Sequence, residues 1–286
     1  MRGIAVGIVL LAMAGLSGNA LGETQVPLTQ ALPSVRIAPQ LVPEIPAWKG
    51  RAFSPPPAPG VHPRVLISPA DLPALRERLE KTGCGKRAIA GVRAWVDGAI
   101  FRPKAPLGKV YAALVAGDDK ALTYADSEWW LGNVPLVLCL NGFDCLVRDD
   151  AERAKTLAVA LTTFARLTGG EARFVGVNAV NPDYAMGLCY DFIYNYMTDA
   201  QRESVRAVIA KATAGKQSHG MDMPAHACTY NFMPHGTQLA LLALCIEGEA
   251  GYDPAVYRKT AELMHAFLNY GIYPSGAPTE EMHYYN

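Results

Sequence analysis

The stretch DDAERAKTLAVALTTFARLTGG, residues 149–170, decides the fold class of this chain. Its apolar side chains recur every three to four residues, which places them on one face of an α-helix. These side chains belong to Ala154, Leu157, Ala158, Leu161 and Phe164. Gly169 and Gly170 follow, and glycine is the usual residue just past the end of a helix. The stretch therefore predicts a helix over 149–168 that buries one face.

Helix signals continue on both sides of this stretch. Ser68-Pro69-Ala70-Asp71 combines a capping residue, a proline suited to a first turn and an acid, and Leu72, Leu75 and Leu79 follow at helical spacing. Thr198-Asp199-Ala200-Gln201 has the pattern of a capping box. We expect further helices over 86–101, 107–116, 118–126, 128–140, 182–196, 198–214, 233–247 and 253–270.

The helices follow one another without a run of alternating strand residues. This order predicts an all-α domain of stacked helical hairpins, either a solenoid or a closed (α/α) toroid. The chain has no fixed-period repeat, which disfavours a regular solenoid. Within 128–140 we expect a disturbance at Pro135, and after it a turn at Asn141-Gly142.

The N-terminus has a different character. Residues 1–22 have one charge, at Arg2, an apolar run and small residues before Gly22, which is the pattern of a secretory signal peptide. The run falls short of the roughly 20 residues that span a bilayer, so we expect export to the periplasm or outside and no stable membrane insertion. Residues 23–61 are rich in proline and form an extended segment, and the helical domain follows over 62–286.

Composition excludes several classes of function. Lys and Arg number 26, as do Asp and Glu, and half of the residues are hydrophobic. A disordered chain and a general nucleic-acid binder are therefore both disfavoured. The nucleotide-binding and α/β-hydrolase motifs are missing, and we expect no cofactor. Six scattered cysteines without a CxxC disfavour a zinc ribbon. Cys139 and Cys145 are close enough in sequence to bridge, and the other cysteines fit buried positions.

The stretch 219–236 joins two predicted helices and is dense in polar side chains. Asn231 and His235 stand at the start of the second helix, where they either point together into the mouth of a helical barrel or act as a helix cap and a core histidine. A zinc site is the weaker alternative, because its ligands do not have helical spacing. Those ligands would be His219, Asp222, His226 and Cys228.

Three other groups of side chains are candidates for binding or catalysis. Residues 280–285 place Tyr284 and Tyr285 beside two carboxylates and a histidine, which suits an acid/base tyrosine or an aromatic plug. The stretch 173–184 carries side chains that bind hydroxyls or a carboxylate, or that cap a helix. Aromatic residues elsewhere fit either a sugar-stacking groove or the core. The expected binding residues are Arg173, Asn178, Trp129, Trp130, Tyr190, Glu281 and His283.

Three segments together resemble the heparinase II/III-like and oligo-alginate lyase group of polysaccharide lyases. They are HPRVLI at 62–67 with the residues to 76, YAMGLCYDF at 184–192, and 231–249 with 276–285. The resemblance implies an (α/α) toroid followed by a β-sandwich, which would lie beyond residue 286. It also implies β-elimination on an acidic polysaccharide or oligosaccharide that contains uronic acid.

The resemblance assigns roles to individual residues. Asn231 and His235 match the pair that neutralises the uronate carboxylate, although in the family the two are adjacent. Tyr284 or Tyr285 matches the tyrosine that moves the proton some 50 residues later. Two other functions remain open, namely an α/α-barrel glycoside hydrolase and a non-catalytic glycan-binding module. The hydrolase would draw its paired carboxylates from Asp183, Asp191, Glu280 and Glu281.

Overall fold

The computed structural model describes residues 56–169, 182–217, 239–258 and 260. Within these ranges the chain forms helices and turns and no strand, which confirms the all-α class. The expected signal peptide, residues 1–22, lies outside the described residues, and so does most of the proline-rich segment. The part of that segment that is described, 56–61, lies against the helical domain, where the Gly60 amide donates to the Glu247 carbonyl at 2.9 Å.

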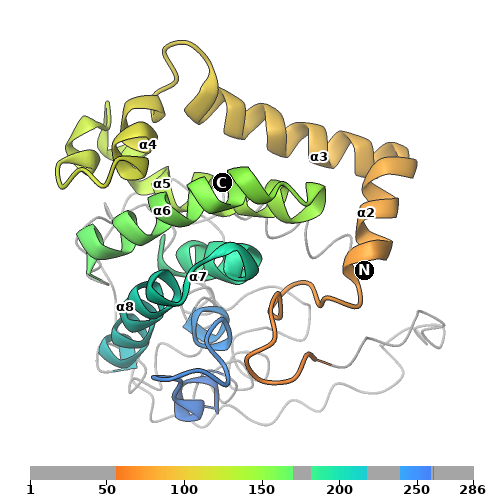
Figure 1. Cartoon of the computed structure of the whole chain (residues 1–286), viewed down its shortest axis with the longest axis vertical. Coiled ribbons are helices and arrows are strands. Elements are labelled where there is room, and N and C mark those ends of the chain that lie inside the picture. The colour runs from red at the N-terminus through yellow and green to blue at the C-terminus, as the bar shows by residue number, and fades with distance from the viewer. Residues whose placement is uncertain (1–55, 170–181, 218–238, 259, 261–286) are drawn as a thin grey trace, which may run out of the picture.

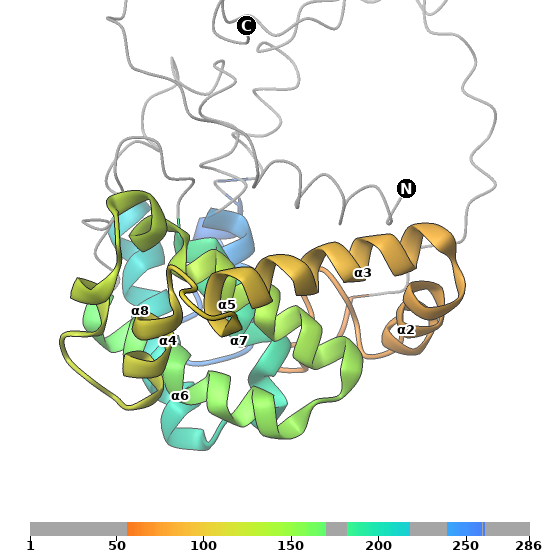
Figure 2. The same ribbon diagram turned by 90° about the horizontal axis from the view of Figure 1, so that it is seen from above.

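The helices follow in an unbroken order through the described residues. They are α2 (Leu72–Lys81), α3 (Gly83–Val96), the π-helix η2 (Asp97–Phe101), α4 (Gly108–Val115), the 3-10 helix η3 (Ala121–Tyr124), α5 (Glu128–Arg148), α6 (Ala151–Thr168), α7 (Pro182–Ile193), the 3-10 helix η5 (Tyr194–Tyr196) and α8 (Asp199–Gln217). Shorter helical turns cover 239–244 and 254–258. In Figures 1 and 2, α5, α6 and α7 lie at the centre, with α2 and α3 along one side and α8 beside α6 and α7.

Local signals set the ends of α6 and α8 as expected. The Asp150 side chain accepts a hydrogen bond from the Arg153 amide at 3.2 Å, and α6 ends at Gly169, whose φ is 57°. At α8 the Gln201 amide donates to the Thr198 hydroxyl at 3.3 Å, and the Thr198 amide donates back to the Gln201 side chain at 2.9 Å. The capping box at Thr198 is therefore confirmed.

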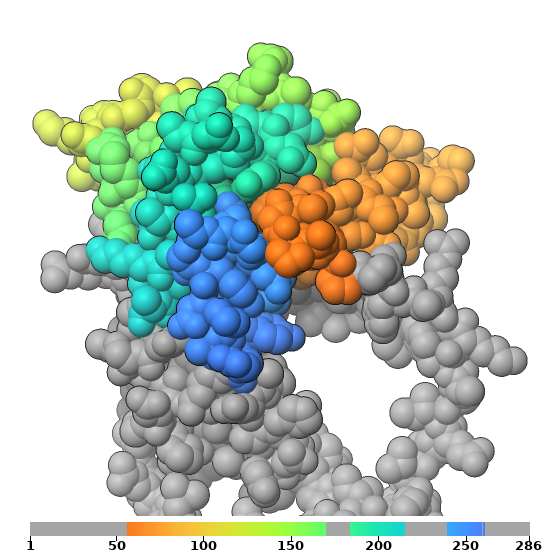
Figure 3. All heavy atoms as spheres, turned by 60° about the horizontal axis from the view of Figure 1, so that its bottom comes forward, coloured from red at the N-terminus to blue at the C-terminus, as the bar shows by residue number. Residues whose placement is uncertain are grey.

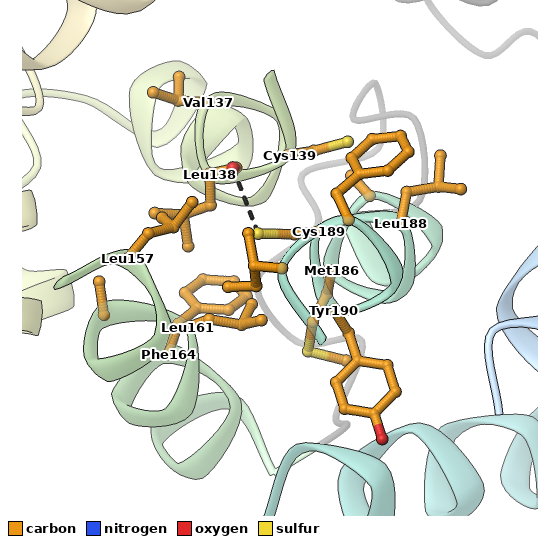
Figure 4. Close-up of a cluster of buried hydrophobic side chains, with 14 of the residues drawn as sticks. Val137, Leu138, Cys139, Leu157, Leu161, Phe164, Met186, Leu188, Cys189 and Tyr190 are labelled. Atoms are coloured by element: carbon orange, nitrogen blue, oxygen red, sulfur yellow. Dashed lines mark hydrogen bonds between the residues drawn. The ribbon is translucent and has the colours of Figure 1, made fainter. Parts of the chain in front are cut away.

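The core forms where α5, α6 and α7 meet. Figure 4 shows apolar side chains from the three helices interdigitating, with the Cys189 thiol of α7 donating to the Leu138 carbonyl of α5 at 3.3 Å. Leu157 and Leu161 of α6, from the stretch that decides the fold class, have no exposed surface. The apolar face predicted for 149–168 is thus the face that packs against the neighbouring helices.

The expected break in α5 is wrong. The helix continues through Pro135 to Arg148, and Asn141 and Gly142 lie inside it rather than in a turn. Proline removes one backbone hydrogen bond, but residues 137–147 are all buried, and this packing outweighs the loss. Gly142 serves contact instead: a Cβ there would lie 3.3 Å from the Cys189 sulfur. Glycine at 142 thus lets α5 and α7 approach closely.

Two further expectations are corrected. Cys139 and Cys145 are free thiols, buried within α5, and make no bridge. Helix 118–126 is reduced to the single 3-10 turn η3, because a turn at Gly117, with φ of 75°, precedes it and extended backbone at Ala125 follows. The buried positions expected for cysteines are confirmed at Cys189 and Cys245.

Helix α5 is long and apolar enough to cross a membrane by length and composition alone. Most of that apolar stretch is buried against neighbouring helices. The central position of α5 in the core accounts for its hydropathy, because a core helix buried on most sides is apolar all round.

The close approach of α7 to the 239–244 helix gives a prediction about stability. A Cβ at Gly187 would lie 2.8 Å from Leu242 Cδ1 and 3.1 Å from the Cys245 sulfur, whereas nothing lies within 4 Å of one at Gly91 on α3. Gly91→Ala should raise the free energy of unfolding by about 0.5–1 kcal/mol through helix propensity. Gly187→Ala should lower it, because overpacking costs about 1–3 kcal/mol. Urea unfolding measures both, and equal effects of the two changes would contradict this packing.

Candidate functional site

Most of the side chains expected to carry chemistry lie outside the described residues. They are Asn231, His235, Tyr284, Tyr285, Arg173, Asn178, Glu281 and His283. The alternative zinc ligands at 219–228 lie there too. Three expected binding residues are described, namely Trp129, Trp130 and Tyr190. Within the described part of the chain, no group of three or more His, Cys, Asp and Glu side chains could hold a metal ion.

The two tryptophans stand in the first turn of α5. Ser127 caps the helix by accepting from the Trp130 amide at 3.3 Å. The Trp129 side chain is 60% exposed, whereas Trp130 packs partly against the core. The two rings meet edge to face, with centroids 4.5 Å apart. Trp129 therefore presents an indole to solvent, as a sugar-stacking residue must.

Tyr190 has a different environment. It is fully buried on α7, and its hydroxyl donates to Glu249 Oε2 at 2.7 Å. In this position its ring has no exposed face. Tyr190 instead belongs to a buried polar cluster around His62, in which charged side chains from four parts of the chain meet.

His62 lies at the centre of this cluster. Its side chain has no exposed surface. Its Nδ1 lies 2.7 Å from Asp191 Oδ1, and its Nε2 lies 3.2 Å from Glu249 Oε1. Each imidazole nitrogen therefore faces a carboxylate oxygen.

Asp191 binds both the imidazole and the backbone of the segment that carries it. The Arg64 amide donates to the two carboxylate oxygens at 2.9 and 3.0 Å, and the Val65 amide donates to Oδ2 at 3.1 Å. The Asp191 side chain is fully buried. It is thus a structural anchor in this cluster, without the access to water that a hydrolase carboxylate needs.

Glu249 completes the cluster from the turn after the 239–244 helix. It accepts from the Tyr190 hydroxyl, and Arg206 of α8 lies 3.7 Å away. Burial raises the pKa of Glu249, but the hydrogen bonds from His62 and Tyr190 and the nearby positive charges outweigh burial, so the pKa is lowered. Glu249 is therefore ionised at neutral pH.

The backbone of the 58–65 segment is held at two more points. The Arg64 guanidinium pairs with Glu247 and donates to the Ala58 carbonyl at 3.0 Å. Gly248, with φ of 85°, lies so close to the segment that a Cβ would be 2.5 Å from Pro59 Cβ. Figure 3 shows the segment lying directly against residues 239–258.

Aromatic rings enclose the imidazole. Tyr194 stacks on it at 3.9 Å between centroids with the planes 17° apart, and Tyr190 meets it edge-on at 5.8 Å. The Arg202 guanidinium lies 4.8 Å from the Tyr194 ring centroid. This packing excludes water from His62 and favours a positive charge on the imidazole, because aromatic faces attract cations.

A second buried carboxylate holds the other side of the domain together. Asp144 of α5 is fully buried and pairs with Arg93 of α3 at 2.8 Å and with Arg153 of α6 at 3.1 Å. Arg148 lies 3.7 Å away. This cluster joins three helices through one carboxylate, and its carboxylate has no exposed oxygen to offer a substrate.

The inspection of sequence patterns missed the His62 cluster. Asp191 lies 129 positions from His62, and Glu249 lies 187 positions from it. One signal was available: His62, Asp191 and Glu249 each fall in a different one of the three segments that carry the family resemblance. The structure brings those three segments together at a single buried point.

The cluster gives a second prediction about stability. Tyr190→Phe keeps the ring but removes the donor to Glu249, and it should lower the free energy of unfolding by about 1.5–3 kcal/mol, the usual contribution of a hydrogen bond to a charged group. Tyr124→Phe is the matched control, since its exposed hydroxyl donates to Asp118 at 3.0 Å. The control should change stability little. Chemical denaturation compares the two variants, and a Tyr190→Phe protein as stable as the control would refute this role.

Comparison of the chain with models of protein families, with curated proteins and with solved structures found no match. A function for this protein therefore has to be inferred from its own residues and contacts.

Proposed function

We propose that this protein is a polysaccharide lyase that cleaves a uronic-acid-containing polysaccharide by β-elimination. In this proposal the described helices form part of an (α/α) toroid, and the chain is exported to meet its substrate. No cofactor is needed, because the protein's own side chains carry out every proton transfer.

The meeting of the three resembling segments at His62 is the observation that supports the proposal most. A chance likeness of short sequence patterns gives no reason for residues 129 and 187 positions apart to share one buried cluster. A domain that requires all three segments to fold does give such a reason. The likeness therefore concerns one structural unit rather than three unrelated patterns.

The reaction requires two kinds of group. The proton at C5 of a uronate becomes acidic enough only when its carboxylate is neutralised, and Asn231 and His235 are assigned that role. Tyr285 or Tyr284 removes the C5 proton, the bond from C4 to the leaving oxygen breaks, and a C4–C5 double bond forms. The same tyrosine then gives its proton to the leaving oxygen.

A tyrosine base needs a lowered pKa. Its ordinary pKa of about 10 must fall by roughly 3 units, or about 4 kcal/mol, for it to act near neutral pH. Among the described residues, every tyrosine with a resolved shift has a raised pKa, mainly because of burial, as at Tyr111, where it is about 12. None of these suits the role, which favours the two tyrosines at 284 and 285.

Trp129 is the described residue that best fits a sugar subsite. Its indole is mostly exposed and is held in place by Trp130, which is anchored on the core. Aromatic side chains stack on sugar rings, and a rigid one loses little entropy on binding. In the proposal, Trp129 contacts the polysaccharide away from the bond that is cleaved.

The proposal predicts the formation of an unsaturated uronate, which is detected by its ultraviolet absorbance when the protein is incubated with alginate, heparan sulfate or a related polymer. Tyr285→Phe should reduce the rate by about 10²–10⁴-fold and leave substrate binding nearly unchanged, because one hydroxyl is lost and the ring stays. His235→Ala should damage both the rate and binding, since it removes neutralisation of the carboxylate.

Tyr284→Phe is the matched control, with the 50-residue interval from His235 favouring Tyr285 as the base. Near-wild-type rates in both phenylalanine variants would refute the tyrosine mechanism. New reducing ends without ultraviolet absorbance, together with loss of activity in Glu281→Gln, would instead indicate a glycoside hydrolase. Binding of the polymer without any cleavage would indicate a glycan-binding module.

A further inference from the structure

The hydrogen bonds of His62 determine its protonation state. A carboxylate oxygen accepts hydrogen bonds and cannot donate one unless it is protonated. Asp191 accepts from two backbone amides, and Glu249 accepts from the Tyr190 hydroxyl, which requires both to be ionised. Both nitrogens of His62 must then donate, and an imidazole that donates from both nitrogens is the imidazolium cation.

The charges of the cluster balance only in that state. Asp191 and Glu249 supply two negative charges, and His62 and Arg206 supply two positive ones. Arg64 and Glu247 form a neutral pair alongside. Loss of the His62 proton would leave a nitrogen lone pair facing a carboxylate oxygen and one buried negative charge without its counter-charge, which is strongly unfavourable.

We infer that His62 is a proton-dependent fastener, which holds the 58–65 segment on α7 and on the 245–252 turn while it is protonated and releases the segment when it loses that proton at alkaline pH. This inference does not depend on the proposed function. The segment lies at the edge of the domain (Figure 3), away from the α5–α6–α7 core, so its release leaves the core folded.

The direction of the pH dependence follows from the surroundings of His62. Burial lowers the pKa of His62, but the hydrogen bonds and negative charges of Asp191 and Glu249 outweigh it, and the pKa is raised above 6.5. Below pH 6.5 the imidazole is protonated whether or not the segment is bound, so the fastening is complete. As the pH rises through the raised pKa, the fastening is lost.

The other groups that face His62 keep their charge over this range. The arginines, Arg202 and Arg206 on α8 and Arg64 on the segment itself, are always protonated. Tyr190 and Tyr194 have raised pKa values, mainly through burial, and stay neutral. Glu249 has a lowered pKa and stays ionised. The imidazole is the one group in the cluster whose ordinary pKa lies near neutrality.

Hydrogen–deuterium exchange of the full chain, measured between pH 6 and pH 10, tests the inference. The amides of Arg64 and Val65, which donate to Asp191, should lose protection by up to tenfold per pH unit above about 6.5, after correction for the intrinsic exchange rate, and then level off. Amides of α6 should keep theirs. Loss of protection in both regions together would mean global unfolding and would overturn the inference, and so would no loss in either.

Two measurements separate charge from packing. In NMR, the His62 ring should titrate above its ordinary pKa, and a normal or lowered value would overturn the inference. Glu249→Gln removes one negative charge but keeps the shape, so the loss of protection should begin at lower pH. Glu203→Gln on the exposed face of α8 is the matched control and should leave the transition unchanged. An unchanged transition in Glu249→Gln would also refute the mechanism.

Discussion

The buried carboxylate of Asp191 is the interaction on which this arrangement depends. A charge removed from water is stable only when hydrogen bonds and an opposite charge replace its hydration. Here the Arg64 and Val65 amides and the His62 imidazole do so, and in return the carboxylate satisfies backbone groups of a segment that forms no helix of its own. One side chain on α7 thus positions the entry of the chain into the domain.

Close contact between helices is the second condition. Gly142 on α5 and Gly187 on α7 lie where a Cβ would crowd a neighbouring side chain, Cys189 for the first and Leu242 for the second. The two glycines let α7 sit near both α5 and the 239–244 helix. As a result Asp191 on α7 and Glu249 after that helix come within reach of the same imidazole.

Much of the helical framework could be predicted from the sequence because its signals are local. The cap at Thr198 and the stop at Gly169 lie within a few residues of the helix ends that they determine. The continuity of α5 could not, because Pro135 and Gly142 are local signals for a break that burial against other helices overrides. The His62 cluster was hidden for a related reason: its partners are distant in the chain, and no pattern in a single sequence shows which charges will meet. The expected catalytic residues at 231–235 and 284–285 stay predictions.

The order in which the chain is synthesised gives the cluster a further consequence. His62 leaves the ribosome long before Asp191, and Glu249 emerges later still, 187 residues after the histidine. Until then the imidazole has no complete set of partners, and the 58–65 segment has nothing to hold it in place. Helices α2–α6 are able to form early from local contacts, but this junction can assemble only near the end of translation. The nascent chain therefore remains open at its N-terminal end until residues around 249 are available to close it.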